Sequence, residues 1–295
     1  MPSKEFEEFL NKIASVKPNP EMTIQEARAS FEKMMKEYPP SDEIVFEPFD
    51  LPGVSAIDAI APASSNEHFA LFFHGGGYNA GSVKSHSDLM GRIANHTRVR
   101  VIGIDYRLAP EHPFPAAVDD AITAYTQLME KGVDPDKVFL IGISAGGGLV
   151  IALLSSLINK KLRSPKAAAV LSPWVDLTLT SSSLQQNEGK DFLTLARLKA
   201  SAEMYLKQES PQNPLASPLF GDLRGFPPLL IHVGRNEILL DDAMKLDEKA
   251  NEAGVNVTLE VFDEMVHAWH IFARKIPEGV EAVDKLNTWL NQHRE

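Results

Sequence analysis

The chain has 295 residues, enough to bury a large core, and this length predicts one domain with a small accessory part. A hydrophobic content of 44% is ordinary for a soluble globular protein, and the net charge of −11 argues against nucleic acid and anionic membranes as partners. The absence of cysteine excludes disulfides and thiolate zinc sites, and it says little about the compartment.

The N-terminal part, residues 4–38, is predicted to form two amphipathic helices with a break at 17–20, where two prolines fall. Thr23 and Glu26 form a capping box at the start of the second helix. The acidic N-terminus lacks the apolar core of a signal peptide, and no apolar run is long enough to span a membrane. A cytoplasmic location is therefore predicted.

Strands and helices alternate beyond residue 40. Strands are predicted at 44–49, 54–61, 69–73, 99–104, 138–141, 168–171, 229–233 and 257–261, and helices at about 85–97, 116–131, 146–160, 240–253 and 278–292. Several strands are continuous apolar runs, as in a parallel sheet that is covered on both faces. The pattern predicts an α/β fold with a mostly parallel central sheet.

One long stretch, between the strands at 168–171 and 229–233, breaks this alternation and contains a single predicted helix near 194–207. An insertion at the carboxyl end of a strand is typical of an active-site lid. We therefore predict a small helical cap made of residues 1–40 and an insertion at about 176–212, on a catalytic domain of residues 41–295.

The segment Gly142-Ile143-Ser144-Ala145-Gly146 lies between a predicted strand and a predicted helix, which is the setting of a G-x-S-x-G nucleophile elbow. The two glycines remove β-carbons that would clash where strand and helix approach, so that the serine can occupy a strained turn.

A nucleophilic serine needs a base. His267 follows the last predicted strand, and the order serine, acid, histidine is that of α/β-hydrolases; His270 is the competing base, whereas His232, inside a strand, is expected in the core.

Backbone donors for a developing oxyanion are predicted in His74-Gly75-Gly76-Gly77, directly after the strand at 69–73. Consecutive glycines let backbone amides approach a substrate carbonyl, and the amide that follows the nucleophile is a further donor. We expect Gly76, Gly77 and Ala145 to form the oxyanion hole.

Together with the stretch DYRLAPEHPFPAA at 105–117, these motifs resemble the hormone-sensitive-lipase-type carboxylesterases, bacterial family IV. The resemblance runs from about residue 40 to the C-terminus. It implies an α/β-hydrolase fold with an N-terminal cap, and hydrolysis of short-chain esters without a metal or other cofactor. It also implies that 106–117 supports the site structurally.

The acid of the triad is assigned through this resemblance. The family motif commonly reads D-P-L-x-D, and matching Leu239 and Asp241 to its leucine and second aspartate places Glu237 at the catalytic acid. Asn236, one residue earlier, would supply an amide instead. The remaining carboxylates are expected to have other roles: Asp241 and Asp242 begin the next helix, and Asp263 lies in a loop.

A second departure from the family pattern is Ile143, which replaces the aspartate that usually precedes the serine. The prediction is a serine carboxylesterase that acts on short-chain esters through an acyl-enzyme. A non-catalytic small-molecule-binding protein on the same fold is one alternative, although Ser144 and His267 weigh against it. An amidase or peptidase is another. The natural ester and a homodimeric state stay open.

Overall fold

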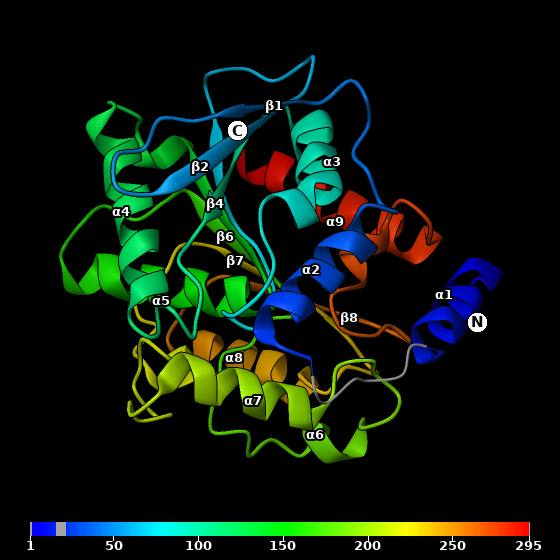
Figure 1. Ribbon diagram of the computed structural model, residues 1–295. Coiled ribbons are helices and arrows are strands. Elements are labelled where there is room, and N and C mark those ends of the chain that lie inside the picture. The colour runs from blue at the N-terminus through cyan, green and yellow to red at the C-terminus, as the bar shows by residue number, and fades with distance from the viewer. Residues whose placement is uncertain (1, 16–21, 295) are drawn as a thin grey trace.

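The structure, a computed structural model, describes residues 2–15 and 22–294. An eight-stranded sheet runs through the molecule (Figure 1). Its strands, in sheet order, are β1 (Val45–Pro48), β2 (Ser55–Ile60), β4 (Arg100–Asp105), β3 (Phe69–Phe73), β5 (Val138–Ile143), β6 (Ala167–Leu171), β7 (Leu229–Gly234) and β8 (Val257–Phe262). The pairs β1–β2 and β2–β4 are antiparallel, and the other neighbours are parallel. All the predicted strands are therefore present.

Helices cover both faces of the sheet (Figure 1). One face carries α4 (Ala116–Glu130), α5 (Ala145–Asn159) and α8 (Leu240–Glu252), and the other carries α3 (Ser87–Thr97) and α9 (Pro277–Arg294). The central strands β3, β5 and β6 are apolar throughout because each side chain enters one of two cores. In β3, Leu71 and Phe73 enter the first core, whereas Ala70 and Phe72 enter the second. The predicted α/β class, with a mostly parallel sheet and helices on both faces, is confirmed.

The two N-terminal helices are α1 (Lys4–Ala14) and α2 (Ile24–Met35). In α1, Phe9 packs on Phe272 with ring centroids 4.4 Å apart. The predicted capping box at Thr23 and Glu26 is confirmed at the start of α2. The predicted break at 17–20 lies outside the described residues.

The insertion between β6 and β7 contains α6 (Ser183–Gln186) and α7 (Leu195–Leu206). The sequence predicts α7 but not α6, whose single turn is too short for a periodic pattern. Short 3₁₀ segments occur at Lys84–His86, Pro135–Lys137, Pro218–Phe220 and Trp269–Phe272. That residues 1–40 and 176–212 act together as a cap stays a prediction.

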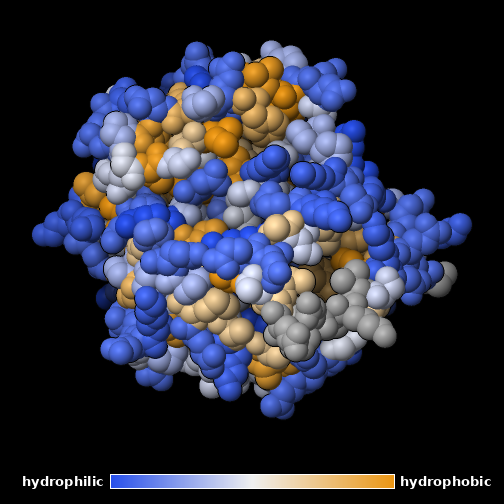
Figure 2. Space-filling view, in the orientation of Figure 1, coloured by the Kyte–Doolittle hydropathy of each residue, from blue (hydrophilic) through white to orange (hydrophobic). Residues whose placement is uncertain are grey.

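The surface is mostly hydrophilic on the face shown in Figure 2, with apolar side chains in small patches between charged ones. Acidic residues outnumber basic ones by 40 to 29 over the whole chain, which gives the negative net charge. Within the described ranges, no helix combines the length and the apolar character needed to cross a membrane.

Candidate active site

The carboxyl ends of the parallel strands gather the predicted site residues at one edge of the sheet. The loops after β3, β5, β7 and β8 carry the glycine run, Ser144, Glu237 and His267, respectively. This edge is where open α/β sheets bind their ligands. Residues that are far apart in the sequence therefore meet because neighbouring strands end together.

Ser144 occupies a sharp turn between β5 and α5, with φ 56° and ψ −121°. A β-carbon at Gly146 would lie 2.0 Å from the carbonyl oxygen of Phe73, and one at Gly142 would lie 2.1 Å from that of Gly146. Only glycine fits at these positions, as the elbow motif predicts. Ile143, in place of the usual aspartate, is fully buried in the second core. An apolar residue suits that position because a buried carboxylate would need partners.

A continuous hydrogen-bond chain links the serine, the histidine and the glutamate. The Oγ atom of Ser144 lies 2.8 Å from Nε2 of His267, and Nδ1 of His267 lies 3.0 Å from Oε2 of Glu237. Glu237 is completely buried, whereas Ser144 and His267 keep 8% and 6% of their surface exposed. This arrangement allows the imidazole to accept a proton from the hydroxyl while the carboxylate holds its other nitrogen.

The second oxygen of Glu237 is also held by donors. Its Oε1 accepts hydrogen bonds from the amide of Gly234 at 2.6 Å and from Oγ of Ser172 at 2.7 Å. Ser172 Oγ in turn accepts a bond of 3.0 Å from the amide of Ala268, next to His267. The carboxylate is thus fixed in rotation, with one oxygen always facing the imidazole.

The competing residues lie elsewhere. Nε2 of His270 faces Nδ1 of the equally buried His232 at 3.2 Å, and burial lowers the pKa of both histidines. Asn236 donates to the carbonyl of Glu264, and Asp263 is an exposed partner of Arg235. The expected core position of His232 is confirmed.

Asp241 and Asp242 lie in the first turn of α8, as predicted. Asp241 accepts a hydrogen bond from the amide of Ser183, and Asp242 accepts bonds from the amides of Val175 and Asp176. Their carboxylates thus join the helix to the chain that follows β6.

The predicted oxyanion donors lie in the turn after β3 and directly after Ser144. Gly76 has φ 124°, and a β-carbon there would lie 2.1 Å from the carbonyl oxygen of Ala80. The amides of Gly76, Gly77 and Ala145 have no acceptor within residues 2–15 and 22–294; Gly76 and Gly77 are half-buried, and Ala145 is buried. The amide of Gly75, by contrast, donates to Nε2 of His86 at 3.1 Å.

His86 is one of three supporting residues that the sequence analysis misses. It is buried, its Nδ1 faces the carbonyl of Ser82 at 3.1 Å, and burial lowers its pKa to about 3, so it is a neutral acceptor for the Gly75 amide. The others are Ser172 and the buried Asp191, whose Oδ1 accepts the amide of His267 at 3.1 Å. No motif marks these residues; Ser172 follows a strand, Asp191 lies in the insertion and His86 lies in the 3₁₀ segment before α3.

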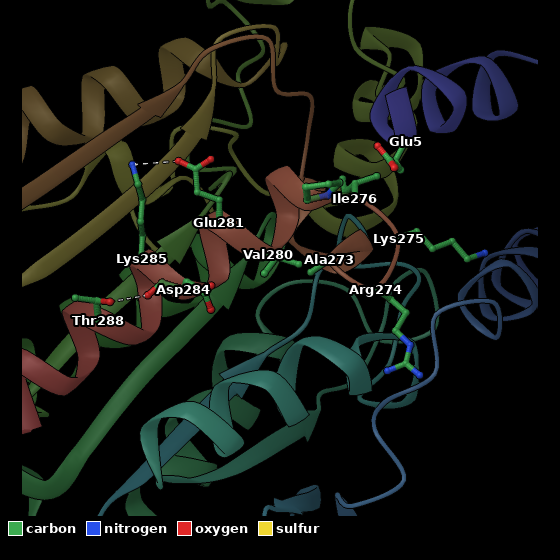
Figure 3. Close-up of a pocket in the computed structure, with 11 residues that line it drawn as sticks. Glu5, Ala273, Arg274, Lys275, Ile276, Val280, Glu281, Asp284, Lys285 and Thr288 are labelled. Atoms are coloured by element: carbon green, nitrogen blue, oxygen red, sulfur yellow. Dashed lines mark hydrogen bonds and ion pairs between the residues drawn. The ribbon is translucent and has the colours of Figure 1, made fainter. Parts of the chain in front are cut away.

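A separate surface groove of about 740 Å³ lies between α1 and the start of α9 (Figure 3). Its lining includes Glu5, Arg274, Lys275 and Lys285, and none of its lining residues belongs to the Ser144 site. The edge of the sheet at Ser144 is the candidate active site because the hydrogen-bonded serine, histidine and glutamate lie there.

Comparison with known proteins agrees with this geometry. Residues 70–271 match the family described as the α/β hydrolase fold. An acetyl-hydrolase of Streptomyces hygroscopicus is 40% identical over 253 residues, which cover 85% of this chain and 83% of that protein. An esterase of Acinetobacter venetianus is 36% identical, with 87% and 85% covered. The crystal structure of an esterase from the bacterial hormone-sensitive lipase family superposes with a TM-score of 0.97 at 40% identity and covers all of both chains. The chain therefore belongs to the α/β-hydrolase family and, within it, to the esterases of the bacterial hormone-sensitive lipase family.

Proposed function

We propose that this esterase hydrolyses short-chain carboxylic esters through an acyl-enzyme, with Ser144 as the nucleophile, His267 as the base and Glu237 as the acid. The hydrogen-bond chain from Ser144 Oγ through His267 to Glu237, at 2.8 and 3.0 Å, carries the proposal. These separations are within the reach that general-base catalysis needs.

Ser144 Oγ attacks the ester carbonyl while Nε2 of His267 takes its proton. The tetrahedral oxyanion accepts hydrogen bonds from the amides of Gly76, Gly77 and Ala145. His267 then protonates the departing alcohol, and Glu237 stabilises the imidazolium and keeps the proton on Nδ1. Water, deprotonated by the same imidazole, attacks the acyl-enzyme and releases the acid.

Short acyl groups are favoured by two observations. The relative from Streptomyces is named an acetyl-hydrolase, and the helices predicted to form the cap are few and short. Each buried methylene contributes about 0.8 kcal/mol until the pocket is full, after which steric exclusion dominates. We expect kcat/KM to be highest between acetyl and hexanoyl p-nitrophenyl esters. A higher value for palmitoyl than for butyryl esters contradicts this expectation.

The deciding experiment compares Ser144→Ala, His267→Ala and His270→Ala on p-nitrophenyl acetate. The first two changes should bring turnover near background, because only an oxyanion hole worth roughly 10³–10⁴-fold over water remains. His270→Ala should retain turnover, since its imidazole contacts His232 instead of Ser144. The reverse pattern would make His270 the base. Ester hydrolysis by Ser144→Ala at a near-native rate would contradict the proposed mechanism as a whole.

The same ester panel addresses the alternatives. A binding protein on this fold would turn over no ester, and an amidase or peptidase would favour anilides or peptides over matched esters. A cytoplasmic location and the absence of nucleic-acid partners belong to this proposal as predictions from the sequence, whereas the oligomeric state stays open.

A further inference from the structure

Asp191 is a buried carboxylate in the insertion, between α6 and α7, and it is 6% exposed. Oδ1 accepts the amide of His267 at 3.1 Å and that of Leu193 at 3.3 Å, and Oδ2 accepts the amide of Ile238 at 3.1 Å. One side chain therefore contacts the base itself and the residue that follows the acid.

These bonds join three segments that are remote in the sequence. Asp191 lies 47 positions before Ile238 and 76 before His267. Its neighbour Asn187 reinforces the contact, since Nδ2 donates to the carbonyls of Glu237 at 2.8 Å and of Arg235 at 3.0 Å. The insertion thus holds the backbone of the acid loop and of the base loop with fixed polar contacts.

Fold stability alone does not explain a carboxylate at this position. Burial raises the pKa of Asp191 to about 6, the charge of Glu237 adds to the rise, and His267 opposes it. A folded pKa above the unfolded value means that the contribution of the group to stability is lost as pH rises from about 4 to about 6. The ionised form at neutral pH is costly to the fold, while the three amides that it accepts connect the loops of His267 and Ile238.

We propose that Asp191 is a positioning residue for ester hydrolysis, which holds the acid and base loops at the spacing that brings His267 Nε2 to Ser144 Oγ. Through Asp191, the alignment of the triad also depends on the packing of the insertion against these two loops. This inference rests on the proposed function, because it assumes that Ser144, His267 and Glu237 carry the reaction.

The test is Asp191→Asn in the full-length protein, because the amide keeps the shape of the side chain but turns an N–H toward a backbone N–H. Asp242→Asn is the matched control: Asp242 is also buried and accepts the amides of Val175 and Asp176 at 3.0 Å, but among the described residues its carboxylate hydrogen-bonds neither the loop at Glu237 nor His267. Three quantities are measured for each variant: kcat and KM on p-nitrophenyl acetate, urea unfolding, and the low-field proton resonance of the hydrogen bond between His267 and Glu237.

For Asp191→Asn we expect kcat to fall about 10- to 100-fold with little change in KM, because small displacements of reacting groups have effects of this size. The low-field resonance should move or disappear. Asp242→Asn should keep kcat and the resonance near native at a temperature where both variants are folded. Asp191→Glu, which keeps the charge but adds a methylene, should also lower kcat because the longer side chain must displace the loops; it serves as the test if the asparagine variant does not fold.

Native kcat and a native resonance in either Asp191 variant would overturn the inference. If Asp191→Asn and Asp242→Asn lose kcat equally and in proportion to their loss of stability, Asp191 has only a structural role. That result would also overturn the inference. Failure of the proposed function is distinguishable, since it appears as activity that survives Ser144→Ala. An inactive Ser144→Ala beside a fully active Asp191→Asn removes this inference alone.

Discussion

The change Glu237→Gln tests the acid assignment most directly, because the structure fixes how the new amide must turn. In the native site, Oε1 faces the amide of Gly234 at 2.6 Å, and a backbone N–H can only donate. The glutamine oxygen must therefore keep the position facing Gly234. The NH₂ group is then directed at Nδ1 of His267, where Oε2 accepts a hydrogen bond in the native protein.

This orientation reverses the histidine tautomer. Because the amide donates to Nδ1, the imidazole proton moves to Nε2, which then donates to Ser144 Oγ and cannot take its proton. The loss of the correct tautomer costs about 10⁴ in kcat in the serine-protease template. We expect kcat of Glu237→Gln to fall by about this factor. The unfolding free energy should change little, because the glutamine oxygen still accepts from the amide of Gly234 and the NH₂ group still hydrogen-bonds His267.

The assay is turnover of p-nitrophenyl acetate across pH, with urea unfolding to verify the fold. Asn236→Ala is the control, because the side chain of Asn236 contacts only the carbonyl of Glu264 among the described residues, and it should stay near native. Turnover of Glu237→Gln within tenfold of native would refute the assignment. A collapse in Asp263→Asn or Asp241→Asn instead would identify the replacement.

Two further changes probe buried groups. His86→Leu should leave the Gly75 amide without its acceptor, which should lower the unfolding free energy by about 1–3 kcal/mol and also lower kcat. His86→Gln should restore part of the unfolding free energy and of kcat. Equal values for the two variants would contradict the role of His86 as the acceptor. Burial raises the pKa of Asp242 to about 7, so the folded state binds the extra proton and stability falls as pH rises from about 4 to 7. For a pKa difference of about three units between the folded and unfolded states, this fall in unfolding free energy amounts to about 4 kcal/mol. The fall should be absent when Asp242→Asn is unfolded in urea across the same pH range. A variant with the same pH dependence as the native protein would contradict the prediction.

The fold and the reacting groups could be predicted from the sequence because their signals are local. Apolar runs mark β3 and β5, and glycine motifs mark the turns that must approach other backbone closely. Glu237 required a family motif, since a glutamate after a strand has no distinctive pattern of its own. Local signals therefore identify what reacts and where the strands end.

The supporting residues could not be predicted in this way. Ser172 contacts Glu237 across 65 positions and Asp191 contacts His267 across 76, so neither leaves a periodic pattern or a spacing in the sequence. Their importance arises only when the insertion packs on the strand ends. His86 is similar, because its acceptor role requires a neutral imidazole, which burial produces.

The nucleophile and the base stand on parts of the fold that differ in depth. Helix α5, which follows Ser144, has 13 of its 15 residues buried, whereas every residue of β8, the edge strand before His267, is only half-buried. Amide exchange should therefore be slowest in α5, which opens only with global unfolding, and faster in β8, where local opening is enough. Residues 265–273, which carry His267, are buried again, so the base should stay in place when β8 opens locally.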